Sequence, residues 1–414
     1  MRGFLLLASL LHASSVPPPH FVARPVPELR GLFNLDTLPP PPAINCGRQW
    51  LGADVAKSIR LPPASDVSAH GTNTDTYLWL WGDTLIGDFN GTYRNWTTMP
   101  RNSVGLLSIS GNGSVVNRSF HWGHYKMPPS PSFSNDLAGP LFQLPYLPDP
   151  VYDWLWIVSG VALGPVLQLV AYHCTSNNET WGCQDSQLIT VHNMHDPPEQ
   201  WNYSVMGIPH SDINLTWGLA VVQAEPWIYL FGKSMLPHLG VVLLRIPTSS
   251  WRSHVPSFTG AQYFCGNLTD AGVWRATFRD RWSLKLLSMG GGVYSASDGF
   301  PDSIMYHEGL QRWYGLVTQS SKHTNINISL ARRLEGPWTT TNLYDIPAPQ
   351  RDNESYLVYA TVAHPELLRS VPNGTLPVSE GDMLFSYVAN TIDPDRLHAD
   401  IDVYIPNFVH VSII

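Results

Sequence analysis

Short apolar and aromatic runs recur along most of this chain, about every 10 to 15 residues, separated by glycine, proline, asparagine and aspartate. Runs of this length, bounded by turn-forming residues, are typical of β-strands. From Trp50 onward, no stretch has the periodicity of a long amphipathic helix. The spacing therefore predicts an all-β protein: a sandwich, a barrel or a propeller. The clearest runs are Tyr77–Trp81, Val104–Ile109, Trp154–Ser159, Trp227–Phe231, Trp313–Thr318 and Met383–Val388.

Length and a degenerate repeat favour the propeller. The strand pattern continues for about 365 residues without a shift in composition, which is longer than an ordinary sandwich. Five aromatic-rich runs of similar form follow one another at intervals of roughly 55 to 85 residues, which predicts five four-stranded blades. These runs are LWLWGDTLIG (78–87), WLWIVSGVAL (154–163), WIYLFGKSML (227–236), RWYGLVTQSS (312–321) and DMLFSYVANT (382–391). We expect one propeller domain over residues 46–410, preceded by a proline-rich, extended lead-in over 16–45.

The first residues and the asparagines predict secretion. Arg2, the uncharged apolar run Gly3–Leu11 and the mostly small residues 12–15 have the form of a signal peptide over residues 1–15. Eleven N-x-S/T sequons make N-glycosylation in a secretory pathway the expectation. They begin at Asn90, Asn95, Asn112, Asn117, Asn178, Asn202, Asn214, Asn267, Asn327, Asn353 and Asn373.

The four cysteines fit an oxidising compartment. Cys174 and Cys183 bracket a short polar loop with a sequon, which predicts a disulfide at its base. Cys46 and Cys265 would then pair by default, although four cysteines allow three connectivities and buried free thiols are the alternative.

Charge and motifs exclude several classes of function. The net charge is −8 with no run of four basic residues, so the basic footprint of a nucleic-acid-binding protein is missing. No phosphate loop, dinucleotide fingerprint, nucleophile elbow or zinc motif occurs. We expect no cofactor and no metal ion; histidines in loose pairs, such as His192 with His195 and His121 with His124, are expected to be solvated. The uncharged segment 154–172 could span a membrane, but Gly160, Gly164 and Pro165 favour two strands joined by a turn.

An ordered set of motifs resembles the first blade of secreted five-bladed β-propellers related to glycoside hydrolases. The set is WLGADVAKS (50–58), LWGDTLIG (80–87) and RNSVG (101–105). ARRLEGPW (331–338) is similar to a blade ending of such propellers, and HPEL (364–367) followed by SYVAN (386–390) is similar to their final blade. The relatives include arabinanase/fructosidase-like enzymes and the domains grouped with microbial endo-D-arabinanases.

The resemblance implies a funnel at the propeller axis, in which carboxylates cleave a glycosidic bond. Asp54 has the position of the nucleophile or base in such propellers. That chemistry needs a second carboxylic acid to protonate the leaving oxygen. Asp302 is a candidate because it precedes an expected inner strand, and Glu366 lies where the last blade would meet the axis.

Further residues are expected to bind substrate around these carboxylates: Asp83, Asn102 and His364 through hydrogen bonds, Trp50 and Trp217 through stacking on sugar rings. Each has a structural alternative, since Asp83 could lock a turn and aromatic side chains also fill β cores. We predict a monomeric secreted protein that hydrolyses or binds an extracellular or cell-wall polysaccharide. The alternative is a non-catalytic, lectin-like propeller, or a protein-binding scaffold with an apolar rim. This alternative stays open because no acidic residue of the expected second or third blade stands in a convincing motif.

Overall fold

The computed structural model describes most of the expected β domain. The described residues are 19–35, 38, 48–63, 74–111, 114–124, 138–144, 153–176, 181–210, 215–234, 240–266, 272–279, 283–285, 287, 303–318, 325–347, 350, 356–370, 381–391 and 393–414. The expected signal peptide 1–15, Cys46 and Asp302 lie outside them.

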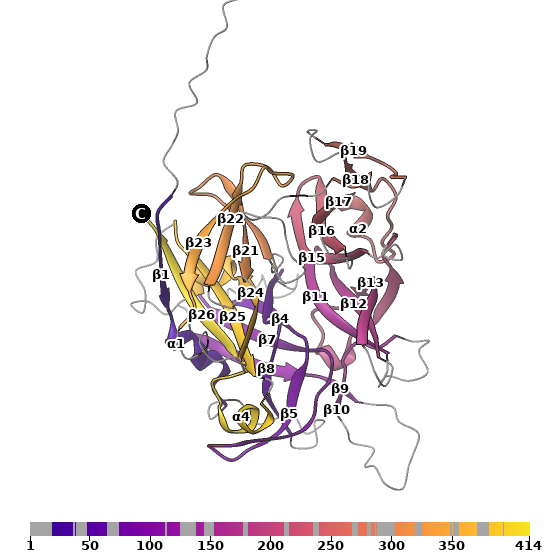
Figure 1. Cartoon of the computed structure of the whole chain (residues 1–414). Helices are drawn as coiled ribbons and strands as arrows, with labels where there is room; N and C mark the ends of the chain where they lie inside the picture. The colour runs from indigo at the N-terminus through magenta and orange to yellow at the C-terminus, as the bar shows by residue number, and fades with distance from the viewer. Residues whose placement is uncertain are drawn as a thin grey trace, which may run out of the picture.

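The described part of the chain is all-β, as predicted, and its strands pair in antiparallel order (Figure 1). One sheet is β3 (Lys57–Leu61), β4 (Thr74–Trp81), β7 (Ser103–Ser110) and β8 (Val115–His121); the next is β11 (Asp153–Leu163), β12 (Val166–Ser176), β13 (Trp181–Val191) and β14 (Tyr203–Gly207). A five-stranded sheet follows: β15 (Leu215–Ala224), β16 (Trp227–Ser234), β17 (Val241–Pro247), β18 (Gln262–Cys265) and β19 (Val273–Arg275). Then come β20 (Ser303–His307), β21 (Arg312–Thr318), β22 (Asn325–Ala331) and β23 (Thr339–Asp345).

The last large sheet joins the two ends of the described chain. Its order is β24 (Tyr356–Ala363), β25 (Met383–Thr391), β26 (Pro406–Ile413) and β1 (Phe21–Pro25). Phe21 pairs with Ile413 and Pro25 with Val409, so β1 runs along the outer side of β26 (Figure 1). Part of the expected lead-in is therefore a strand of this sheet.

Smaller elements complete the described architecture. β2 (Gln49–Ala53), β5 (Thr84–Phe89) and β6 (Arg94–Thr98) form a three-stranded sheet, and β9 (Gly123–His124) pairs with β10 (Ala138–Gly139). The helices are short: α1 (Pro27–Arg30), α2 (Thr248–Trp251), α4 (Pro394–Ala399), and the 3₁₀ turns η1 (Gly31–Phe33), η5 (Pro198–Gln200) and η8 (Pro365–Ser370). None of the described helices is long and apolar enough to cross a membrane. Segment 154–172 forms the β11–β12 hairpin, as predicted.

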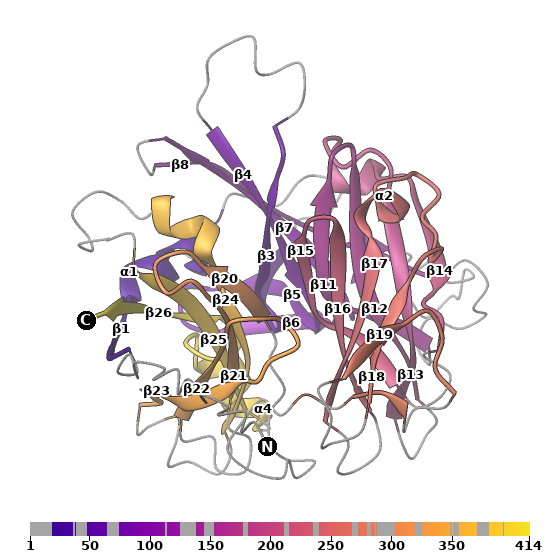
Figure 2. The same ribbon diagram turned by 90° about the horizontal axis from the view of Figure 1, so that it is seen from above.

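Successive large sheets contact one another through their first strands (Figure 2). The Ser159 hydroxyl of β11 accepts a hydrogen bond from the Val221 amide of β15 at 3.1 Å. The Ser303 hydroxyl of β20 does the same for the Ala363 amide of β24 at 2.9 Å. Ser58 on β3 is 2.5 Å from Nδ1 of His364, directly after β24. A hydrogen bond from a backbone amide to a serine hydroxyl therefore joins two different pairs of sheets. The contact between Ser58 and His364 brings the last large sheet against the first.

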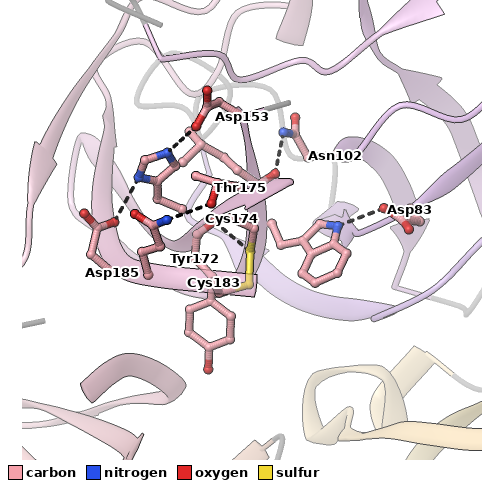
Figure 3. Close-up of a disulfide and its surroundings, with 12 residues drawn as sticks. Asp83, Asn102, Asp153, Tyr172, Cys174, Thr175, Cys183 and Asp185 are labelled. Carbon is pink, nitrogen blue, oxygen red and sulfur yellow. Dashed lines mark hydrogen bonds and ion pairs between the residues drawn. A yellow bond between two sulfur atoms is a disulfide. The ribbon is translucent and has the colours of Figure 1, made fainter. Parts of the chain in front are cut away.

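The predicted disulfide between Cys174 and Cys183 is present and joins β12 to β13 (Figure 3). The second predicted bridge, between Cys46 and Cys265, is not formed in the structure, and Cys46 itself lies outside the described residues. Cys265 is a buried free thiol whose sulfur lies 3.5 Å from the Tyr263 carbonyl. Its place inside the apolar cluster of the third sheet explains why it is buried without a bridge.

Candidate functional site

Asp54 lies in the short link between β2 and β3, where the backbone is unusual. Val55 and Ala56 both have positive φ, 72° and 51°, a region that side chains other than glycine rarely occupy. Gly82 makes room on the other side, because a Cβ at that position would lie 2.2 Å from Asp54 Oδ1. The Gly82 amide also donates to the Asp54 carbonyl at 3.2 Å. The fold thus constrains this carboxylate from both its own backbone and the facing turn.

Two tyrosines from the last sheet region face Asp54. The Tyr359 hydroxyl of β24 donates to Oδ2 at 3.1 Å and accepts from Asn390 Nδ2 of β25 at 3.0 Å. Tyr404 is buried, has a φ of 62°, and its carbonyl accepts from the Ala53 amide at 2.8 Å. Asp54 keeps some exposed surface as a residue, but Oδ1 is buried, and none of the described groups forms a well-aligned hydrogen bond with it. Because no well-aligned donor occupies Oδ1, this oxygen is a position where a ligand group or a water can bind.

Asp83 is the second acidic group of the site. It lies in the turn between β4 and β5, and both of its oxygens are engaged: Oδ1 accepts from the Trp156 indole at 2.8 Å and Oδ2 from Arg101 at 3.0 Å. Figure 3 labels Asp83 at the end of the first of these bonds. Burial is the largest effect and raises the pKa of Asp83 above its ordinary value, although the charge of Arg101 and both hydrogen bonds oppose this rise. Trp156 and Arg101 therefore favour the ionised form of this carboxylate.

The two carboxyl groups affect each other's protonation. Burial, and then the charge of Asp83, raise the pKa of Asp54 from 3.8 to about 8; hydrogen bonds from Tyr359, the Asp83 backbone and Tyr404 oppose this rise. Two close carboxyl groups in different environments are the usual basis for separate acid and base roles. At neutral pH Asp54 favours its protonated form, which can donate a proton to a ligand oxygen.

Two predicted carboxylate partners remain untested by geometry. Asp302 lies outside the described residues. Glu366 belongs to η8, directly after His364, but only its backbone is described. Among the described side chains, Asp83 is the acidic group that lies next to Asp54.

The structure corrects the predicted sugar-stacking residues. Trp50 is 1% exposed and stacks on Phe120 in the core of the first sheet region. Trp217 is fully buried and packs near Tyr263 in the cluster between the second and third sheets. Neither ring has a free face for a sugar, because the apolar core covers both. Trp81 is buried as well.

Asn102 and His364 are also buried, so neither side chain can contact a ligand. The Asn102 amide donates to the carbonyls of Phe142 and Leu155, and its oxygen accepts from the Phe142 amide, so it joins the first and second sheets. His364 lies between Ser58 and Ser386 and packs on Trp79. Every polar atom of these two side chains is used inside the protein, which accounts for their residue types without a substrate.

Sequence reasoning missed Tyr359, Tyr404, Asn390 and Trp156 as members of the site. Asn390 and Arg101 stand inside motifs that carry the family resemblance, which is the signal that could have pointed to them. No such sequence signal marks the two tyrosines, because each stands in an apolar segment where an aromatic residue is expected to fill the core.

The fold and the site define an all-β protein that presents a buried pair of carboxyl groups. Residues 45–413 match the family described as "Domain of unknown function (DUF5005)", and the chain belongs to this family. No curated protein matches the chain.

Among solved structures, the fold is similar to that of a putative hydrolase from Bacteroides ovatus ATCC 8483. The TM-score is 0.66 at 16% sequence identity, over 94% of this chain and 90% of that chain. Looser matches are an α-L-arabinanase from Cellvibrio cellulosa complexed with arabinohexaose (TM-score 0.40, 11% identity, 87% of this chain and 91% of that one) and a xylan β-1,4-xylosidase from Bacillus Halodurans C-125 (TM-score 0.44, 9% identity, 88% and 53%). These two overlaps are too loose to carry an argument about this chain.

Proposed function

We propose that this protein is a secreted five-bladed β-propeller that hydrolyses an extracellular or cell-wall polysaccharide. The blades would be the five large sheets, in chain order. Two observations support this: adjacent sheets bond through their first strands, and Ser58 of the first sheet bonds to His364 beside the last. Strand β1 also pairs with β26 in the last sheet, which joins the two ends of the described chain.

The observation that carries the proposed activity is the coupled pair of Asp54 and Asp83. With a pKa near 8, Asp54 is suited to protonate the glycosidic oxygen of the leaving sugar, rather than to act as the nucleophile or base that the sequence suggested. The Asp83 carboxylate, whose ionised form Arg101 favours, raises that pKa and would offset the positive charge that develops on the sugar ring. The base would be a third carboxylate, for which Asp302 and Glu366 remain the candidates.

Secretion and glycosylation belong to the same proposal. Five of the sequon asparagines lie in the described residues; Asn90, Asn95, Asn117 and Asn202 are exposed and Asn327 is partly exposed. An oligosaccharide transferred to asparagine needs such surface positions. Expression in a secreting eukaryotic host, followed by enzymatic removal of N-glycans, should lower the apparent mass of the secreted protein.

The activity is tested by incubating the secreted protein with a panel of plant, algal and bacterial wall polysaccharides. We expect wild type to release oligosaccharides, and Asp54→Asn and Asp83→Asn to lose that release. Asp75→Asn is the matched control, because Asp75 pairs with Arg60 at the surface, away from the pair. Release that survives in Asp54→Asn would refute the assigned acid.

A second candidate function, a non-catalytic glycan-binding propeller, has its own supporting observation. Both oxygens of Asp83 are already bonded, so the described carboxylate next to Asp54 is not free to act as the base. In this case wild type and Asp54→Asn would both release nothing from the panel, and glycan binding would be measurable on an array.

A further inference from the structure

Two histidines from different sheets meet at the surface, away from the acidic pair. His192 directly follows β13 of the second sheet, and His254 lies in the exposed segment after α2, between β17 and β18 of the third. Their Nδ1 atoms are 3.3 Å apart. The two rings are tilted by 36°, and their centroids lie 5.5 Å apart. The Nδ1 atoms thus face each other across the junction of the two sheets.

The other nitrogen of His192 has a hydrogen-bond partner. Nε2 lies 3.2 Å from the Ser204 hydroxyl of β14. When Nε2–H donates to Ser204, the lone pair of Nδ1 points toward His254. A histidine that binds a metal through one ring nitrogen commonly donates from the other to a neighbouring oxygen, which orients the ring.

The separation fits a tetrahedral metal. Two nitrogens bonded to zinc at about 2.0–2.1 Å in tetrahedral geometry lie about 3.3–3.4 Å apart. Ring centres in such a chelate would be roughly 5.2 Å apart, a few tenths of an ångström less than observed, so a small rotation of the exposed His254 would aim both lone pairs at one ion. An N–H···N hydrogen bond between neutral rings accounts for the same contact without a metal, and the test must separate the two.

We propose that His192 and His254 form a two-histidine site for a divalent first-row transition metal, with zinc, nickel and copper as the ions that imidazole prefers. Water would complete the coordination, because the described residues contain no group of three or more histidine, cysteine, aspartate or glutamate side chains placed to hold an ion. A metal bound here links the second sheet to the third. This inference departs from the sequence-based expectation of no metal and is independent of the proposed glycosidase activity.

The test is calorimetric titration of the full chain with ZnCl₂, repeated with NiCl₂, after treatment with a chelator. We expect one ion per chain, and a melting temperature that rises with metal concentration because the ion binds the folded state. His192→Ala and His254→Ala should each lose that binding and that rise. His195→Ala is the matched control, since His195 is an exposed histidine three residues from His192.

Cobalt(II) gives a second readout, because its visible absorption reports the geometry of the nitrogens around it. Equal metal binding by wild type and both alanine variants would overturn the site, as would the absence of binding by wild type at millimolar zinc. An ion that binds wild type and His254→Ala equally would show a contact with His192 alone, which also contradicts the chelate. Circular dichroism of each variant establishes that the fold is intact, as expected for substitutions at exposed or half-buried positions.

Discussion

The hydroxyl of Tyr359 donates to Asp54 Oδ2 at 3.1 Å, although the two residues stand 305 positions apart in the sequence. Tyr359 belongs to β24, the first strand of the last large sheet, and Asp54 precedes β3, the first strand of the first large sheet. The same hydroxyl accepts from Asn390, so the carboxyl group is connected to two strands of that sheet. The protonation of Asp54 therefore depends on how the two ends of the chain are brought together.

Tyr359→Phe should raise the pKa of Asp54 further. The hydrogen bond from Tyr359 lowers the pKa of Asp54, so its removal raises that pKa further. If Asp54 is the proton donor, the alkaline limb of the pH–rate profile shifts to higher pH. Stability should fall by about 1 kcal/mol, because Asn390 loses its acceptor. Tyr387→Phe, which removes a tyrosine bond to Gln350, is the control: a similar loss of stability with an unmoved pH profile is expected.

Asp54→Asn should stabilise the protein at neutral and mildly alkaline pH. The pKa of Asp54 is raised from 3.8 to about 8 by burial and Asp83, so the unfolded chain releases its proton near pH 4 while the folded chain retains it. Folding stability is therefore lost as the pH rises from about 4 to 8, and asparagine, which does not ionise, avoids this loss. We expect a melting temperature roughly 2–5 °C above wild type at pH 7.5.

The pH dependence separates this effect from better packing. The difference between Asp54→Asn and wild type should shrink steadily toward pH 4, where Asp54 is protonated in both states. A constant difference at every pH, or one that grows in acid, would contradict the raised pKa. Asp75→Asn at the surface serves as the reference for a carboxylate outside the site.

Gly82→Ala should damage the site more than a glycine substitution elsewhere. Its Cβ would lie 2.2 Å from Asp54 Oδ1 and 3.0 Å from a Val55 methyl, so the strained Asp54–Ala56 link must move. Overpacking of this kind costs typically about 1–3 kcal/mol. Gly31→Ala is the control, because nothing lies within 4 Å of its Cβ. Urea unfolding measures the stability of both variants. Equal midpoints would show that the Asp54–Ala56 link moves without a cost in stability, which would contradict the prediction.

The fold class and one carboxylate could be predicted from the sequence, because both depend on local patterns. The 154–172 hairpin follows from its central Gly-Pro turn, and Asp54 from the motif around it. The repeat was less regular than expected: four of the five aromatic runs are second strands of their sheets, whereas Trp154–Leu163 is part of the first strand, β11. Burial was the main source of error, since Trp50 and Trp217 have the residue type of a sugar platform but lie in the core.

The remaining members of the site depend on long-range geometry that no local pattern encodes. Tyr359 and Tyr404 reach Asp54 because the last sheet lies beside the first. Trp156 reaches Asp83 from β11, a strand of the second sheet. Single-sequence reasoning has no information on which strands become neighbours, so it assigns such aromatic residues to the core.

Arg94→Met should destabilise the protein and displace Tyr404. Arg94 is fully buried and donates to the carbonyls of Leu51 and Val403 at 3.2 and 2.9 Å, and to that of Asp400 at 2.5 Å. Methionine keeps much of the volume but leaves these buried acceptors without a donor, at a cost of about 3 kcal/mol. Activity or ligand binding should fall as well, because Val403 immediately precedes Tyr404. Arg60→Met, at an exposed ion pair, should change stability by less than about 1 kcal/mol.

His173 should make stability depend on pH in the same sense as Asp54, with stability lost as the pH rises. Its ring lies 3.3 Å from both Asp153 and Asp185, the two aspartates labelled beside the disulfide in Figure 3. The bond to Asp185 is the main cause that raises the pKa of His173, and the same contact lowers the pKa of Asp185. A histidine with a raised pKa contributes stability that is complete below about pH 6.5 and is lost as the pH rises through its folded value. The aspartate's share is lost only in acid, below about pH 4.

The free energy of unfolding of His173→Gln should therefore be lower than that of wild type, and the difference should be largest between about pH 4 and 6.5. We expect about 1 kcal/mol for this half-buried group. This difference in the free energy of unfolding should be smaller at pH 9, where the side chain at position 173 is neutral in both proteins. Unfolding in urea at pH 5.5 and 9 measures it, with His195→Gln as the exposed control. If the gap is wider at pH 9 than at pH 5.5, the imidazole is folded in its neutral form, and the two aspartates do not stabilise its charge.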